Sequence, residues 1–172
     1  IMGLLFKDIF EKAFDSPVVV CFMLLVTGTL LYTANRMKSG FKKASDIKVA
    51  DALIVGIFQG LAITPGVSRS GSTIFAGMMR GFSRDLATRF SFIMSIPAIL
   101  GAAVLEFSDY YRAPVLASEV AVMLAGAAVA AVSGALAIKF LISILKKGKL
   151  HYFSYYCWLV GIIALVAHLV FQ

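Results

Sequence analysis

The sequence predicts an all-α integral membrane protein that forms a single domain over residues 1–172, with about four transmembrane helices and one re-entrant helix-loop-helix hairpin. Of its 172 residues, 60% are hydrophobic and only 15% are charged, and the mean hydropathy is +0.92. A water-soluble globule of this size needs more polar surface than these residues supply. Apolar runs of about 20 residues, long enough to cross the hydrocarbon core of a bilayer, are separated by short charged connections. The net charge of +7 arises mainly from these connections, which is typical of membrane topology and argues against a nucleic-acid partner.

The expected elements follow from the spacing of the apolar residues. Residues 1–16 mix apolar and charged side chains at helical spacing, which predicts an amphipathic helix at the membrane interface. Nearly uncharged runs predict four transmembrane helices, at 17–35, 84–107, 118–145 and 152–171. Cys21 and Cys157 lie inside two of these runs, far from any cluster of His or acidic residues. We therefore expect both cysteines to be packing residues rather than disulfide or metal partners.

The segment 49–82 needs a different interpretation. Two apolar pieces, each too short to cross the bilayer, flank the polar stretch "TPGVSRSGST" at 64–73. The segment is either one broken transmembrane helix or a re-entrant hairpin that returns to its own side. Only the hairpin places the basic connection 36–48, the region around Arg84 and the basic "KKGK" on one side, with the acidic connection 108–117 on the other. The positive-inside rule therefore favours the hairpin, with both chain ends outside.

The polar stretch between the two half-helices has the composition of an anion site. If the second half-helix begins near Ser70 to Thr73, its unpaired N–H groups and the positive end of its dipole point into the loop. Arg69 adds a planar fork of donors that suits phosphate oxygens. Gln59 lies just before the stretch and is expected to line the same cavity. Hydroxyl groups that can donate hydrogen bonds and glycines that let the backbone approach a ligand complete the expected substrate contacts. These residues are Gly66, Ser68, Ser70, Gly71, Ser72 and Thr73.

A purely structural interpretation of the same stretch is also open. In that case Arg69 pairs with a carboxylate or with a helix C-terminus elsewhere, and the hydroxyl groups only cap helices. An arginine at membrane depth is energetically unfavourable, so a functional role is the default expectation for it.

The stretch "QGLAITPGVSRSGSTI" closely resembles the signature of the undecaprenyl-diphosphate phosphatase family, the bacitracin-resistance membrane proteins. The family pattern is Pro-Gly-x-Ser-Arg-Ser-x-x-Thr, which here falls on Pro65, Gly66, Ser68, Arg69, Ser70 and Thr73. The resemblance implies a multi-pass hydrolase of the bacterial plasma membrane that removes the terminal phosphate of undecaprenyl diphosphate, the C55 lipid carrier of peptidoglycan synthesis. It also implies two inverted halves around a cavity that opens to the outer face. On this resemblance Arg69 binds the diphosphate, and Ser68 and Ser70 are the candidate catalytic hydroxyls.

A second motif of the family, a Glu-x-x-x-Glu pattern with a Ser-Ser-Thr-Gly-His run, does not occur in this sequence. In the family it is thought to supply the nucleophile or base and to hold a divalent cation, Mg²⁺ or Ca²⁺. The chain therefore resembles the C-terminal portion of a family member without about the first third, and we expect it to be inactive alone. Undecaprenyl diphosphate and membrane lipids are the expected partners, and a homo-oligomer is compatible with the sequence. A lipid-phosphate or anion transporter is the alternative function, because transporters also bind anions at broken helices within the membrane.

Overall fold

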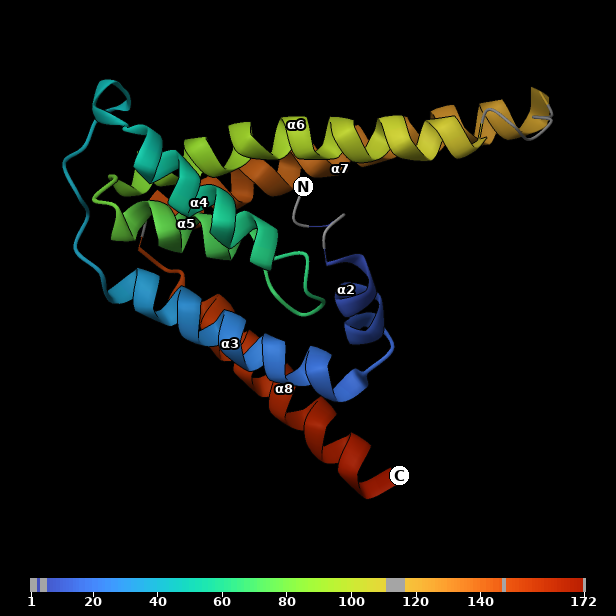
Figure 1. The fold of residues 1–172 in the computed structure, drawn as a ribbon, viewed down its shortest axis with the longest axis horizontal. Helices are drawn as coiled ribbons and strands as arrows, with labels where there is room; N and C mark the ends of the chain where they lie inside the picture. Colours follow the sequence, from blue (N-terminus) through green and yellow to red (C-terminus); the bar gives the residue numbers. More distant parts are fainter. Residues whose placement is uncertain (1–2, 4–5, 111–116, 147, 172) are drawn as a thin grey trace.

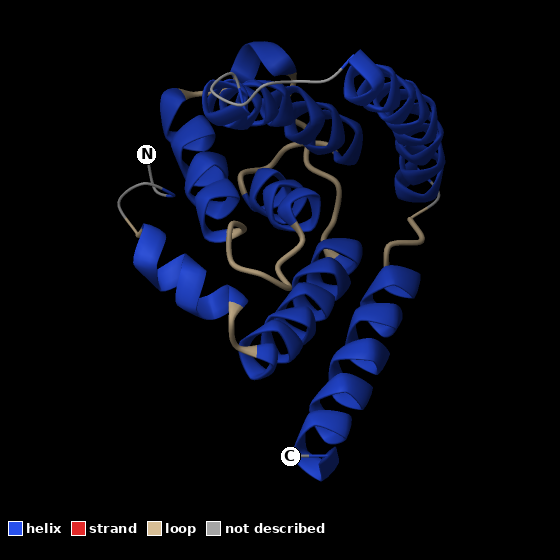
Figure 2. Ribbon diagram, turned by 90° about the vertical axis from the view of Figure 1, so that its right-hand side faces the viewer, coloured by secondary structure: helices blue, strands red, loops and turns tan. Residues whose placement is uncertain are grey.

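The computed structural model describes residues 3, 6–110, 117–146 and 148–171. Figure 2 shows helices joined by loops in this part of the chain, without a strand. The predicted all-α fold is confirmed (Figure 1). The elements in chain order are α2 (Lys7–Phe14), α3 (Pro17–Arg36), the short 3-10 helix η1 (Ala44–Asp46), α4 (Val49–Leu61), α5 (Arg69–Met79), α6 (Arg84–Tyr110), α7 (Ala117–Lys146) and α8 (His151–Phe171).

Four of the helices are long and apolar enough to cross a membrane. Within the described residues these spans are Pro17–Arg36, Arg84–Val104, Val120–Ile144 and His151–Phe171. They fall where the sequence predicts transmembrane helices, so the chain has the helices of a multi-pass membrane protein. The acidic connection expected at 108–117 lies largely outside the described residues, as does Lys147 of the basic "KKGK".

Helices α3 and α8 pack closely along their length (Figure 1). A Cβ atom at Gly28 of α3 would overlap the ring of Trp158 of α8, so the small residue permits the close approach. The indole Nε1 of Trp158 donates to the Leu25 carbonyl at 3.2 Å and to Thr29 Oγ1 at 3.3 Å. Of the two short helices, α5 packs against α3 of this pair, and α4 packs against α5.

The segment between α3 and α6 folds as an antiparallel helical hairpin made of α4 and α5. The rings of Phe58 and Phe75 pack between the two helices, with centroids 5.8 Å apart. Asp51, in the first turn of α4, accepts a hydrogen bond from Arg80 Nε at 2.7 Å, immediately after the end of α5. Because the start of α4 and the end of α5 meet in this contact, the segment turns back on itself rather than continuing as one broken span.

The open end of the hairpin joins the ends of the long helices. Arg84, which begins α6, donates to the carbonyl oxygen of Asn35 at 2.8 Å, near the end of α3. The Asn35 side chain in turn accepts from the Leu150 N–H at 3.1 Å, just before α8. The basic connection 36–48 crosses this same end, where Gly40 N–H donates to the Phe82 carbonyl at 3.2 Å. The basic connections therefore gather at one end of the molecule, as the charge pattern predicts.

The buried core lies between the hairpin and the ends of α3, α6 and α8. It is apolar and brings together residues far apart in the sequence, namely Leu31, Ala34, Ile74, Met78, Phe82, Ala87, Leu150 and Cys157. Helix α5 is the most enclosed helix of the described structure. Its packing in the core also fixes the position of the loop before it.

Candidate functional site

The loop between α4 and α5 is fastened to α3 by one buried threonine. Thr27 is 3% exposed, donates through Oγ1 to the Gly66 carbonyl at 2.9 Å, and accepts from the Ser68 N–H at 3.0 Å. Gly66 has a φ of +87° and lies so close to α3 that an added Cβ would be 2.5 Å from the Val20 carbonyl oxygen. Only glycine combines this backbone conformation with this approach, which explains the glycine of the motif.

Helix α5 begins at Arg69, one residue before the start predicted from the sequence. The cause is Ser68, which is extended (φ −72°, ψ 114°) and acts as the N-cap, its side chain accepting from the Gly71 N–H at 3.2 Å. The N–H groups of Arg69 and Ser70 have no partner within the described residues. These two donors and the positive end of the helix dipole therefore remain available to an anion.

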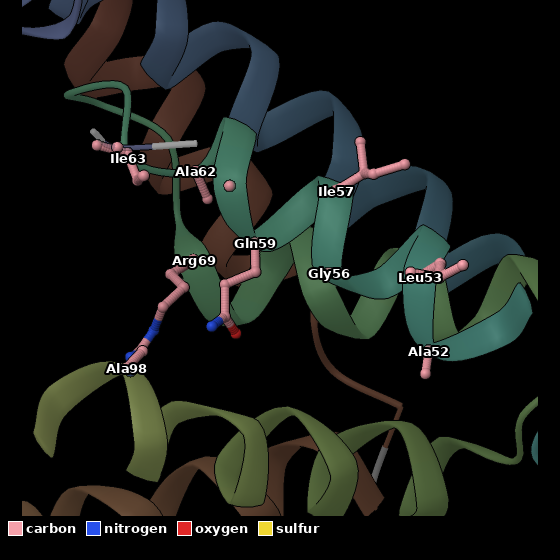
Figure 3. Close-up of a pocket in the computed structure, with 11 residues that line it drawn as sticks. Ala52, Leu53, Gly56, Ile57, Gln59, Ala62, Ile63, Arg69 and Ala98 are labelled. Carbon is pink, nitrogen blue, oxygen red and sulfur yellow. The ribbon is translucent and has the colours of Figure 1, made fainter. Parts of the chain in front are cut away.

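Arg69 reaches into a cavity of about 590 Å³ between α4, the loop and α6 (Figure 3). Its side chain extends toward α6 and ends beside Ala98. Within the described residues no carboxylate or other acceptor pairs with the guanidinium. Among the residues that the structure describes, Arg69 therefore forms no internal ion pair. The remaining cavity lining is mostly small or apolar: Gly3, Ala52, Leu53, Gly56, Ile57, Gln59, Gly60, Ala62, Ile63 and Ala98.

Gln59 lines the same cavity, as the sequence predicts, and extends toward α6 like Arg69 (Figure 3). Its amide Nε2 donates to the Met94 carbonyl of α6 at 3.4 Å. The other end of the amide, Oε1, is buried and has no partner among the described residues. The amide of Gln59 thus lies between α4 and α6 with its nitrogen end toward Arg69 (Figure 3).

The remaining candidate residues do not line this cavity. Thr73 is 1% exposed, and its hydroxyl lies 2.6 Å from the Ser91 hydroxyl of α6 and also donates to the Arg69 carbonyl at 3.0 Å. Ser72 is 2% exposed and its hydroxyl has no partner within the described part of the chain. An added Cβ at Gly71 would lie 3.0 Å from Leu31, so this glycine serves helix packing. Thr73 and Gly71 therefore hold α5 in place. Of the predicted substrate contacts, those of Arg69, Gln59 and the first turn of α5 remain.

Asp51 is a structural residue that the sequence analysis did not single out. It is fully buried and accepts from Lys42 Nζ at 2.9 Å, Arg80 Nε at 2.7 Å and the Lys48 N–H at 3.1 Å. The hydrogen bond from Lys42 is the main cause that holds the pKa of Asp51 well below its usual range, and Lys48 and Arg80 contribute further. A signal was available, because an acidic residue three positions after a helix N-cap often bonds back to the cap N–H.

The cavity lining does not fit a divalent cation. Such ions take carboxylate, carbonyl or imidazole ligands, and the residues that line the cavity include neither an acidic residue nor a histidine. Among the described residues no group of three His, Cys, Asp or Glu side chains is placed to hold a metal. The Arg69 guanidinium would also repel a cation at this position. The cation that the resemblance implies has no ligand set here, and no chemical step is derived from it.

Comparison with known proteins gives a consistent result. A family model described as "Bacitracin resistance protein BacA" matches residues 1–163. A protein of Alkaliphilus metalliredigens named undecaprenyl-diphosphatase is 49% identical over 96% of this chain and 60% of its own length. Proteins with the same name from Halothermothrix orenii and Methanothermobacter thermautotrophicus are 46% and 48% identical, over 96% and 98% of this chain and 64% and 93% of their own lengths. The chain thus spans about three fifths of the first two relatives and most of the third. The chain belongs to the bacitracin resistance protein BacA family.

Proposed function

We propose that this protein acts as an undecaprenyl-diphosphate phosphatase, removing the terminal phosphate of a polyisoprenoid diphosphate to leave the lipid monophosphate. The observation that carries the proposal is the unpaired Arg69 guanidinium in a cavity, at the start of a helix whose first N–H groups have no partner among the described residues. The names of the relatives support the choice of substrate.

Arg69 and the start of α5 are suited to the phosphate end of such a substrate. The guanidinium can donate two parallel hydrogen bonds to phosphate oxygens, and the N–H groups of Arg69 and Ser70 add neutral donors with a favourable dipole. In a site of low dielectric, these donors also stabilise the charge that develops on phosphoryl oxygens in the transition state. Fixed donors need little reorganisation, and the Thr27 contacts with the loop keep them fixed.

The rest of the cavity is suited to the lipid end. Leu53, Ile57 and Ile63 line it and are 63%, 52% and 39% exposed. The cavity therefore opens onto an apolar surface, and an isoprenoid chain can leave it without entering water. A ligand with a charged head and a long apolar tail matches both parts.

The orientation follows from where the cavity lies along α6. Ala98, beside the end of Arg69, is 14 residues after Arg84 at the basic end. This separation corresponds to about 21 Å along a helix, within a hydrocarbon core of about 30 Å. If the basic end faces the cytoplasm, the cavity lies toward the outer leaflet. We place the protein in the bacterial plasma membrane, with the cavity opening to the outer face.

The proposal gives the residues of this chain substrate binding and charge stabilisation. Ser68 and Ser70 were predicted as catalytic hydroxyls, but a serine nucleophile needs an adjacent base. The cavity lining includes no histidine or carboxylate that could serve as one.

Phosphate release from a C55 prenyl diphosphate by the purified protein in detergent tests the proposal directly. Because the chain is expected to be inactive alone, the assay uses the intact protein that carries this segment together with the family's second motif, and we expect release by that protein and its loss in Arg69→Ala. Saturable flux of the lipid phosphate across vesicles without phosphate release would instead support the transporter. Undiminished release by a correctly folded Arg69→Ala variant would contradict the role of this cavity.

A further inference from the structure

Helix α6 supplies one wall of the cavity, and three of its contacts with the hairpin lie on one face. The Ser91 hydroxyl lies 2.6 Å from the Thr73 hydroxyl of α5. Further along α6, the Met94 carbonyl accepts a hydrogen bond from α4, and Ala98 lies beside the end of Arg69 (Figure 3). Positions 91, 94 and 98 are three and four residues apart, so they share a face of the helix. The rotation of this face relative to α5 therefore decides how Arg69 meets the α6 wall.

Ser91 lies between the apolar core and the part of α6 that lines the cavity. Nearer the basic end, Ala87 of α6 belongs to the buried core. Ser91 and Ser95 are buried as well, whereas residues 96–100 are all exposed. The contact between Ser91 and Thr73 thus joins α6 to α5 where the enclosed part of α6 comes to its end.

The partners of the two hydroxyl groups indicate which of them donates to the other. The Thr73 hydroxyl lies 3.0 Å from the Arg69 carbonyl oxygen and 3.2 Å from that of Ser70, and both carbonyls can only accept. The Ser91 hydroxyl has no partner but Thr73 among the described residues. If Ser91 donates to Thr73 and Thr73 donates to Arg69, both buried protons are used; the reverse would leave the Ser91 proton unpaired. Two hydrogen bonds in series therefore run from α6 to the backbone of Arg69.

This pair of hydrogen bonds acts on the residue that begins the proposed anion site. Hydrogen bonds are directional, so the pair fixes how the first turn of α5 is rotated against α6. That rotation sets where the Arg69 guanidinium and the unpaired N–H groups of Arg69 and Ser70 point. Thr27 holds the preceding loop from α3, and Ser91 supplies the corresponding constraint from α6.

We propose that Ser91 is a positioning residue, which holds the first turn of α5 through Thr73 so that Arg69 and the unpaired N–H groups point at one anion. Ser91 does not line the cavity, and it acts on a ligand only through these neighbours. The inference rests on the proposed function only in taking Arg69 as the anion contact.

Binding of inorganic phosphate to the full chain in detergent, measured by calorimetry at pH 7, tests the inference. We expect Ser91→Ala to weaken phosphate binding about fivefold, within the range that one hydrogen bond contributes. Ser95→Ala is the matched control, because it removes another buried serine hydroxyl of α6, one that donates to the Phe92 carbonyl of the same helix. Both variants should lower the thermal midpoint by a few degrees, but Ser95→Ala should bind phosphate as the natural protein does.

A double-mutant cycle separates positioning from a general loss of packing. Thr73→Val keeps the shape of the side chain without its hydroxyl, and we expect it to weaken phosphate binding at least as much as Ser91→Ala. Thr73→Ser keeps the hydroxyl and should bind phosphate nearly as the natural protein does. Because Ser91 acts through Thr73, Ser91→Ala should cause no further loss in the Thr73→Val background.

Four results would overturn the inference. They are full phosphate affinity in Ser91→Ala, an equal loss in Ser95→Ala, additive losses in the double variant, and no measurable phosphate binding by the natural protein.

The outcome is separable from that of the proposed function. Phosphate binding that depends on Arg69 and Ser91, without hydrolysis of the prenyl diphosphate by the intact protein, would remove the enzymatic proposal and keep the role of Ser91. Hydrolysis that depends on Arg69, with natural phosphate affinity in Ser91→Ala, would do the reverse.

Discussion

Arg69 is the residue on which the proposed chemistry of this protein depends. A guanidinium within a membrane is energetically unfavourable unless it is paired or solvated, and Arg69 has no protein partner in the described structure. Its neighbours are a set of helix N–H donors and one amide. We therefore expect an anionic ligand, rather than a carboxylate of the protein, to pair with the guanidinium.

Replacing Arg69 by lysine should retain the charge but lose the paired donors. We expect Arg69→Ala to lower kcat/KM for a prenyl diphosphate by at least about 100-fold, and Arg69→Lys by an intermediate factor, because a planar fork holds phosphate oxygens better than a single ammonium. Steady-state phosphate release measures both. Equal rates for Arg69→Lys and the natural protein would show that charge alone is needed.

Thr27, on α3, should affect phosphate binding because it holds the loop that precedes Arg69. Thr27→Val keeps the shape of the side chain but removes both hydrogen bonds to the loop, which we expect to cost about 1–3 kcal/mol locally. Phosphate affinity should fall, and the thermal midpoint should fall by a few degrees, because two backbone groups of the loop lose their partner. Thr27→Ser restores the hydroxyl and should restore affinity. If Thr27→Val binds phosphate normally, the loop is held by other contacts.

At the scale of the element, α4 determines the shape of the cavity. Ala52, Gly56 and Gly60 are spaced four residues apart on α4 and all line the cavity, so they share one face of the helix. An added Cβ at Gly56 would meet no atom within 4 Å. The small residues of α4 therefore leave space that the protein itself does not fill.

A large side chain at Gly56 should occupy that space and discriminate by chain length. We expect Gly56→Phe to lower kcat/KM for a C55 diphosphate by about tenfold or more, the effect of roughly 1–3 kcal/mol of steric conflict. A C15 diphosphate should be affected less, and Gly56→Ala should leave both nearly unchanged. Comparing kcat/KM for the two lengths is the measurement. An equal loss for both substrates would place the isoprenoid chain elsewhere.

The contact of Asp51 with Lys42 and Arg80 should make the hairpin sensitive to acid. Because the folded pKa of Asp51 is depressed, its contribution to stability is present above the unfolded pKa of about 4 and is lost as pH falls below it. The thermal midpoint should therefore be steady from pH 7 to 5 and fall at more acidic pH. Asp51→Asn should lower the midpoint at pH 7 and reduce this pH dependence. Asp85→Asn is the control, because Asp85 belongs to a half-exposed ion pair with Arg89. It should change neither the thermal midpoint at pH 7 nor the pH dependence of that midpoint.

At the scale of the whole molecule, one end collects the basic connections, and the cavity runs along α4 from Ala52 near this end to Ile63 and Arg69 farther from it. The hairpin contributes to both, because Asp51 and Arg80 lie at the basic end and the loop with Arg69 lies away from it. Because of this separation, the proposed phosphate site lies within the membrane while the charged connections are not buried there.

Single cysteines at Lys43 and Asp15 test this arrangement. Both positions are exposed, and they lie in the connections at opposite ends of α3. In a background with Cys21 and Cys157 replaced by alanine, an impermeant thiol reagent should label the two sites from opposite sides of the membrane. Labelling of both from one side would rule out α3 as a transmembrane helix.

The sequence by itself determined the features that depend on local physics. Helix length and hydropathy define the four long helices, and the charge of the connections indicates a hairpin at 49–82. The motif predicts that Arg69 is an anion contact. Each of these depends on residues close together in the chain.

Only the tertiary structure decided which side chains share the cavity and which merely support it. Thr27 and Gly66 are 39 residues apart, and Asp51 and Arg80 are 29 apart. Thr73 fits the motif as well as Arg69, yet its hydroxyl bonds to Ser91 on α6 and does not line the cavity. Contacts of this kind depend on how helices rotate and pack against one another, and hydropathy constrains that packing only weakly.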